Sequence, residues 1–163
     1  MNPISNFQFP ISKRGFTLIE LLVVVAIIGL LLSVIMVALG NARLKSRDAR
    51  RLSDMQQVKS GMDIYYSLGS GYVDAASWTT AQSSGSTLSC SGTEVLKVPQ
   101  DPLNIGNPAF VYTYTPGGNT TTGCGGTVYS NFKVQFQTEG PTSLGPPTTY
   151  YLSPAGITTT PPF

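Results

Sequence analysis

A long, uninterrupted apolar segment near the N-terminus constrains this chain more than any other feature. Between Phe16 and Asn41 the only ionisable side chain is Glu20, and no polar stripe recurs at the spacing that marks an amphipathic helix. About 25 residues at roughly 1.5 Å each give a helix of about 37 Å, which can cross a hydrocarbon core of about 30 Å. The sequence therefore predicts a transmembrane helix over residues 16–40.

Two common kinds of apolar segment explain this stretch less well. A secretory signal peptide has a short apolar run followed by a small-residue cleavage site, whereas this run is longer and reaches Arg43 without such a site. A plain membrane anchor fits the length but gives no reason for Glu20, because a carboxylate in lipid costs about 2.5–3.5 kcal/mol. Placement of Glu20 at the membrane interface is the simplest alternative.

The residues that open the apolar segment form a specific pattern. They place a basic pair, a glycine, a phenylalanine and a glutamate in a fixed order, Lys13-Arg14-Gly15-Phe16-Thr17-Leu18-Ile19-Glu20. This string resembles the processing site of type IV prepilins and type II secretion pseudopilins. The resemblance implies that residues 1–15 are a leader removed after Gly15, that Phe16 becomes the methylated N-terminus, and that Glu20 acts in filament assembly.

The same resemblance implies a set of partners and a route through the cell. The partners are a prepilin peptidase that also methylates, copies of this chain, other pilin-like subunits and an inner-membrane assembly platform. The precursor would be a single-pass protein of the cytoplasmic membrane and the mature chain an extracytoplasmic filament subunit. A type IV pilus and a secretion filament both remain open, and no nucleic-acid partner is expected because the net charge is only +2.

A helical pattern continues beyond the apolar segment. Over residues 41–68, apolar side chains recur mostly at spacings of three and four, with charged residues between them: Leu44, Leu52, Met55, Val58, Met62 and Tyr65. Gly69 and Gly71 supply a C-terminal stop. We therefore expect one helix whose first half is apolar on every face and whose second half is amphipathic.

Basic residues crowd the start of this second half. Arg43, Lys45, Arg47, Arg50 and Arg51 lie within nine positions of one another. Such a cluster can bind lipid head groups or DNA, but it is more often a solvated helix face or a set of ion pairs between subunits. The sequence alone gives no reason for the cluster.

Residues 69–163 have the composition of a small β domain rich in Ser, Thr and Gly. Three strands are expected, over Val128–Gln137, Phe110–Tyr114 and Thr149–Leu152. The clearest is Val128–Gln137, where apolar and polar residues alternate. Gly117–Asn119 and Gly140-Pro141 have the chemistry of turns. An antiparallel sheet packed on the amphipathic half of the helix makes the fold class α+β.

No catalytic constellation is visible in the chain, and we expect no enzyme. The sequence contains no histidine, so the commonest general base and the usual partner of a nucleophilic serine or cysteine are missing. The alternative to a filament subunit is a membrane-anchored, adhesin-like binding module that recognises glycans through Trp78 and the tyrosines. Exposed aromatic clusters would favour that alternative.

The two cysteines favour a disulfide over a metal site. Cys90 and Cys124 are the only cysteines, and without histidines they cannot complete a four-ligand zinc site, whereas an exported domain permits a disulfide. Asp101-Pro102 resembles a stretch that lies near a calcium site in major pseudopilins. Calcium needs six to eight oxygen ligands, and only Glu139 is present in the later loop that would supply further ones. We therefore expect Asp101-Pro102 to form a turn, and we expect no strong calcium site and no other cofactor.

Overall fold

The computed structural model describes residues 15–104 and 110–163. The chain divides into two compact units, Met1–Gly40 and Asn41–Phe163. Its elements, in chain order, are α1 (Leu18–Gly69), α2 (Ala75–Ser84), β1 (Thr87–Cys90), β2 (Thr93–Lys97), β3 (Thr113–Gly123), β4 (Gly126–Gln137), β5 (Thr149–Ser153) and β6 (Gly156–Thr158). The predicted long helix followed by a small antiparallel β domain is confirmed, and the fold class is α+β.

The part of the first unit that the structure describes consists mainly of the beginning of α1. Every described side chain from residue 18 to residue 40 is exposed, although nearly all of them are apolar. By length and composition α1 qualifies as a helix able to cross a membrane, and none of its most apolar stretch is buried inside the protein.

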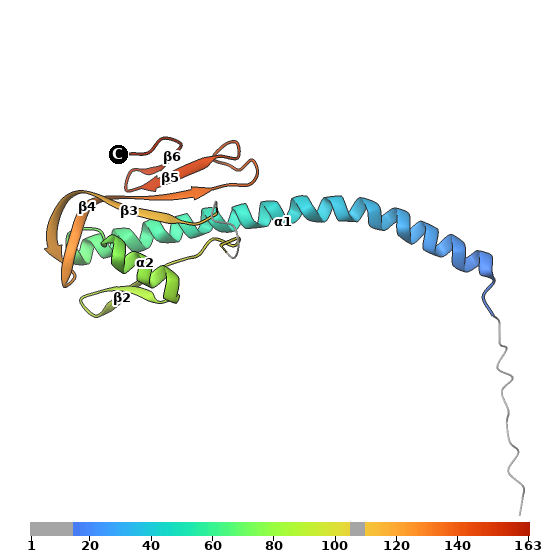
Figure 1. Cartoon of the computed structure of the whole chain (residues 1–163), viewed down its shortest axis with the longest axis horizontal. Coiled ribbons are helices and arrows are strands. Elements are labelled where there is room, and N and C mark those ends of the chain that lie inside the picture. The colour runs from blue at the N-terminus through green and yellow to red at the C-terminus, as the bar shows by residue number, and fades with distance from the viewer. Residues whose placement is uncertain (1–14, 105–109) are drawn as a thin grey trace, which may run out of the picture. The chain divides into compact units, whose positions relative to one another are not determined.

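The second unit is built around residues 41–69 of α1 (Figure 1). The predicted apolar stripe is confirmed here, since Met55, Val58, Met62 and Tyr65 are buried and belong to one core cluster. The sheet contributes to the same cluster from alternate positions of β4, namely Val128, Phe132, Val134 and Phe136. The period-2 pattern of the strand and the helical pattern of α1 thus meet in a single core.

The strands form two antiparallel sheets. One has the order β3-β4-β5-β6 and the other pairs β1 with β2. Each of the hairpins β1–β2 and β3–β4 turns through two residues with positive φ, Ser91 (51°) with Gly92 (81°) and Cys124 (50°) with Gly125 (82°). Positive φ at both central residues is typical of type I′ turns, whose twist matches that of paired strands.

Two details of the predicted sheet were wrong. The expected turn at Gly117–Asn119 lies inside β3, where the register with β4 shifts between Gly117 and Thr120 and Gly118 has a φ of 78°. A bulge uses the same glycine chemistry as a turn, which is why sequence could not separate the two. The strand expected to begin at Phe110 begins at Thr113.

The helix α2 was not predicted. It begins after Asp74, whose carboxylate accepts a hydrogen bond from the backbone N–H of Ser77 at 2.9 Å, and it ends at Gly85 in the left-handed conformation. Asp at the N-cap and Gly at the C-terminal end are the usual signals for a helix. The segment between them is rich in Ser and Thr, so its apolar periodicity is weak, and only Trp78 and Ala81 are buried.

Candidate functional site

The processing segment lies just before α1. Gly15, Phe16 and Thr17 are not helical, and the side chain of Phe16 is 88% exposed. A Cβ added at Gly15 would meet no atom within 4 Å. The Gly15–Phe16 peptide bond therefore sits in a non-helical, uncovered stretch of chain. Lys13 and Arg14, the predicted basic pair of the leader, lie outside the described residues.

Glu20 is engaged by the first turn of the helix. Its Oε2 accepts hydrogen bonds from the backbone N–H of Thr17 at 2.9 Å and from the Thr17 hydroxyl at 2.8 Å, and the N–H of Glu20 donates to the Thr17 hydroxyl at 3.3 Å. Reciprocal bonds between an N-cap threonine and a glutamate three residues later form a capping box. The Thr-x-x-Glu spacing was visible in the sequence, so this arrangement could have been predicted.

A cluster of charged side chains, here called the ion cluster, lies in the second unit. Its members are Arg47, Asp48 and Arg51 of α1, with Asp101 and Glu139 from two loops. The Arg51 side chain is fully buried.

The guanidinium of Arg51 binds both carboxylate oxygens of Asp101, through Nε at 2.6 Å and through Nη2 at 2.9 Å, in a bidentate pair.

The remaining nitrogen of Arg51 holds the other carboxylates. Nη1 donates to Asp48 Oδ1 and to Glu139 Oε1, each at 2.7 Å. Arg47 also binds Glu139 in a bidentate pair, at 2.7 Å and 2.5 Å. Asp48 accepts backbone N–H groups of Glu139 at 3.0 Å and Gly140 at 2.8 Å. The loops that contain Asp101 and Glu139 are distant in sequence, and both are thereby joined to α1.

The contacts within the ion cluster shift the pKa values of Arg51 and Glu139. Burial by itself lowers the pKa of Arg51, but the hydrogen bonds to Asp101, Glu139 and Asp48 outweigh burial and raise it, so the guanidinium stays charged. The hydrogen bonds from Arg47 hold the pKa of Glu139 below its ordinary value, against the effect of burial. Arg51 and Glu139 are therefore both ionised at neutral pH.

These contacts give the basic residues after the apolar segment two different roles. Arg51 is buried and Arg47 is partly buried, and both pair within the chain, which corrects the expectation of a solvated face or of pairing between subunits for these two positions. Arg43, Lys45 and Arg50 are exposed and form no ion pair with the described residues. The sequence did not predict the pairing of Arg47 and Arg51, because the carboxylates of Asp101 and Glu139 that bind them lie far along the chain.

The carboxylate of Asp101 is engaged by groups of the protein itself. Both of its carboxylate oxygens bind Arg51, and Oδ1 also accepts the backbone N–H of Leu103 at 2.8 Å. Within residues 15–104 and 110–163 no grouping of three or more side chains has the arrangement of a metal site. A guanidinium already neutralises the carboxylates that a cation would need.

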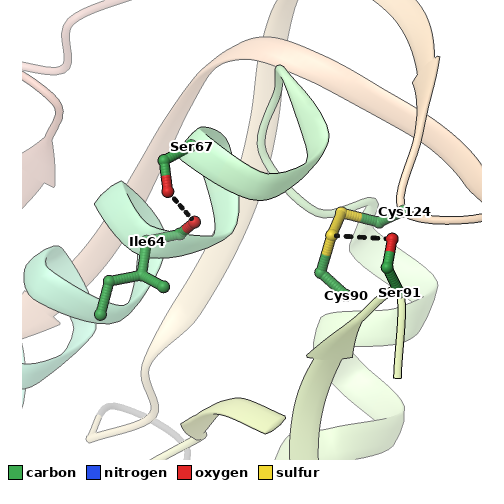
Figure 2. Close-up of a disulfide and its surroundings, with 5 residues drawn as sticks. All are labelled: Ile64, Ser67, Cys90, Ser91 and Cys124. Carbon is green, nitrogen blue, oxygen red and sulfur yellow. Dashed lines mark hydrogen bonds between the residues drawn. A yellow bond between two sulfur atoms is a disulfide. The ribbon is translucent and has the colours of Figure 1, made fainter. Parts of the chain in front are cut away.

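Cys90 and Cys124 form a disulfide that closes a sequence separation of 34 residues, with their Cα atoms 4.6 Å apart (Figure 2). It joins the end of β1 to the β3–β4 turn beside the end of α1, where the Ser67 hydroxyl donates to the Ile64 carbonyl at 2.7 Å. A Cβ on Gly69 would collide with the sulfur of Cys124. Gly69 therefore provides room for the disulfide, while Ser70, with a φ of 56°, takes the left-handed position that follows the helix.

Trp78 does not form a surface for ligand binding. Its side chain is 1% exposed and stacks on Tyr114 with ring centroids 4.6 Å apart. The alternative of an adhesin-like module gains no support from Trp78, because the indole belongs to the core between α2 and the sheet.

Comparison with known proteins identifies the N-terminal segment. Residues 11–36 match the family model described as the prokaryotic N-terminal methylation motif. Neither a comparison with curated proteins nor one with solved structures gave a match. The matched stretch includes Gly15, Phe16 and Glu20 and enters the exposed apolar part of α1. Over these residues the chain therefore carries the N-terminal signature of type IV prepilins and pseudopilins.

Proposed function

We propose that this chain is the precursor of a structural filament subunit of a type IV pilus or a pilus-like secretion filament. A prepilin peptidase of the cytoplasmic membrane cuts between Gly15 and Phe16 and methylates the new N-terminus. The subunit then leaves the membrane through an assembly platform and joins other pilin-like subunits outside it. The methylation motif at the head of an exposed apolar helix carries this proposal.

The local geometry supports cleavage at this bond. The helix begins at Leu18, so the bond to be cut lies outside the hydrogen-bonded turns, with Thr17 as the N-cap. A peptidase must bind its substrate in an open conformation, because a helical peptide bond is shielded by its neighbours. Cleavage here removes the leader and leaves the capping box of Thr17 and Glu20 in place.

Glu20 has a partner before cleavage and gains a second one afterwards. In the precursor its carboxylate caps the helix at Thr17. Cleavage creates a positive amine on Phe16, four residues before Glu20, and residues four apart share a helix face. The amine of the same or of a neighbouring subunit then pairs with the carboxylate when both enter an apolar filament core, where an unpaired charge is strongly unfavourable.

The apolar side chains of residues 18–40 supply the surface for assembly. They include Leu22, Ile28 and Leu31, which are 57%, 49% and 54% exposed. In the precursor this surface is covered by lipid, and in the filament it is covered by the same segments of other subunits. Both environments remove the same apolar area from water, so transfer between them needs no change in the helix itself.

The experiment is co-expression of the full chain with a prepilin peptidase, followed by mass spectrometry of the N-terminus. The expected product begins at methylated Phe16. Gly15→Ala should block or strongly reduce cleavage, whereas Gly29→Ala should be cut normally. The two glycines are a matched pair, since a Cβ at either position meets no atom within 4 Å. Any difference between the variants therefore reports recognition by the peptidase and not damage to the fold.

Two substitutions of Glu20 separate its roles. Glu20→Gln keeps a side chain that can complete the capping box, whereas Glu20→Ala removes it. Both variants should be cleaved and both should fail to assemble, because pairing with the amine requires the charge. Full-length wild-type chain beside an active peptidase would contradict the proposal, and normal assembly of Glu20→Gln would remove the role of the charge.

A further inference from the structure

A cavity of about 430 Å³ opens beside the disulfide in the second unit. Its walls come from the end of α1, from α2, from β1 and from the β3–β4 turn. The disulfide joins two of these walls, since Cys90 ends β1 and Cys124 lies in the turn. The volume falls within the range of about 300–1,000 Å³ that is typical of small-molecule sites.

Tyr65 lines this cavity and has a hydroxyl without a partner among the described residues. The residue is 6% exposed and lines the cavity, and its hydroxyl makes no hydrogen bond with the described residues. In the part of the chain that the structure describes, the only fully enclosed side-chain polar atom without a partner is Trp78 Nε1. The Tyr65 hydroxyl is therefore not sealed in the core, and Tyr65 is one of the residues that line the cavity.

Asp74 supplies a fixed acceptor on a second wall. Its Oδ1 accepts the Ser77 backbone N–H at 2.9 Å and its Oδ2 accepts the Ser77 hydroxyl at 2.6 Å. Burial raises the pKa of Asp74, but these hydrogen bonds outweigh burial and lower it, so the group stays ionised. A carboxylate has about four acceptor sites, which leaves each oxygen able to accept a further bond from a ligand.

Hydroxyl groups complete the lining. Along β1, Leu88 and Cys90 are buried, whereas Thr87 is half-buried and Ser89 exposed. Thr87 and Ser89 both line the cavity, as does Thr127 at the start of β4. Among the described residues that line it, Asp74 is the one charged residue, and none is a lysine or an arginine. The chemistry suits a neutral ligand with many hydroxyl groups and disfavours phosphate, sulfate and carboxylate groups.

We propose that this cavity binds one unit of a neutral saccharide, with sugar hydroxyls donating to Asp74 and exchanging hydrogen bonds with Tyr65 and the Ser and Thr hydroxyls. Matching of the polar groups that line the cavity to sugar hydroxyls gives such a site its selectivity, because an analogue without the hydroxyl leaves a protein group unpaired. The proposal does not depend on cleavage or filament assembly, since none of the cavity residues lies in residues 15–40.

The test measures sugar binding to the full-length chain in micelles of dodecylphosphocholine, a detergent whose headgroup contains no sugar. Saturation-transfer NMR would be recorded with glucose, galactose and N-acetylglucosamine, and with methylammonium as a cationic probe. At least one sugar should bind with a millimolar dissociation constant, and methylammonium should not. Tyr65→Phe should weaken binding about fivefold, as expected for one hydrogen bond, and Asp74→Asn, which keeps an N-cap residue, should weaken it at least as much.

The matched control is Tyr66→Phe, because Tyr66 is the next residue of α1 and does not line the cavity. It should bind as tightly as the wild-type chain. Thr87→Val keeps the shape and strand preference of its residue and should also weaken binding, which tests the site independently if Tyr65→Phe unfolds. Absence of saturation transfer with all three sugars, preference for methylammonium, or equal binding by all of the variants would each overturn the proposal.

Discussion

The two halves of α1 place the same kinds of side chain in opposite surroundings. In residues 18–40 every described side chain is exposed, including long runs of Leu, Ile and Val. In residues 41–69 a stripe through Met55, Val58 and Met62 is fully buried against the domain. The first half therefore needs lipid or other subunits to cover it, whereas the second half is covered by its own chain.

The halves also differ in how they handle charge. The first contains one carboxylate, Glu20, held by a capping box at the helix start. The second contains Arg47, Asp48 and Arg51, whose charges are satisfied by loops of the same chain. Buried charges are tolerated only when they are paired. The charges of the second half are thus paired within the folded unit, whereas the one carboxylate of the first half is bound only by its own helix start.

The largest expected effect tests how strongly the second unit depends on its covalent link. The double variant Cys90→Ser with Cys124→Ser should lower the free energy of unfolding by roughly 4 kcal/mol, because the bond closes a long loop. Guanidinium unfolding of the full chain in micelles, followed by the fluorescence of Trp78, measures this. Trp78 is the single tryptophan and reports on the second unit alone. Wild-type chain with reductant should match the double variant, and a loss below 1 kcal/mol in both would contradict the role of the disulfide.

The next effect tests the ion cluster. Arg51→Met should lower the free energy of unfolding by about 3 kcal/mol, at the lower end of the range for a broken buried ion pair, because Arg47 still pairs with Glu139. The exposed Arg43 is the matched control, and Arg43→Met should change the same quantity by less than about 0.5 kcal/mol. Equal losses of unfolding free energy in the two variants would show that the buried ion pairs of Arg51 contribute no more to stability than the exposed Arg43.

A pair of apolar substitutions, one in the core and one at an exposed position, compares the two halves directly. Met62→Ala creates a cavity at a residue with no exposed surface and should cost about 2–3 kcal/mol in the Trp78 transition. Ile28→Ala, at a residue that is 49% exposed, should leave that transition unchanged. If Ile28→Ala were equally destabilising, residues 18–40 would contribute to the stability of the second unit and the contrast would fail.

The smallest effect is a dependence on pH. The pKa of Glu139 is lowered from 4.5 in the folded chain by hydrogen bonds from Arg47, opposed by burial. A carboxyl whose pKa is lowered on folding stabilises the protein above its unfolded pKa, and this contribution is lost as the pH falls through the folded pKa. As the pH is lowered from about 6 to about 3, the free energy of unfolding should therefore fall less steeply in Glu139→Gln than in the wild-type chain. Parallel profiles would exclude Glu139 as a source of acid sensitivity.

Local patterns in the sequence predicted the elements that depend on near neighbours. The apolar run to residue 40, the stripe through Met55 and Met62, and the alternation of β4 all follow from periodicities of 3.6 and 2. The α+β class followed from their order. These features survive because the preference of each segment agrees with its place in the fold.

What sequence could not predict depends on contacts between distant residues. Arg51 looked like one member of a basic surface cluster, and only the approach of Asp101 and Glu139 makes its burial possible. Gly69 looked like a helix stop, but its place is set by the sulfur of Cys124. The cavity beside Tyr65 arises from four elements that no local pattern connects.

The four-way contact at Arg51 also has an evolutionary consequence. One guanidinium satisfies Asp48, Asp101 and Glu139 at once, so a change at any one of these positions alters what the other three require. Among related chains these positions should vary together, as an inherited set, and Arg43 should vary independently of them. Loops that contain Asp101 and Glu139 can then be exchanged between lineages only along with the helix that holds Arg51.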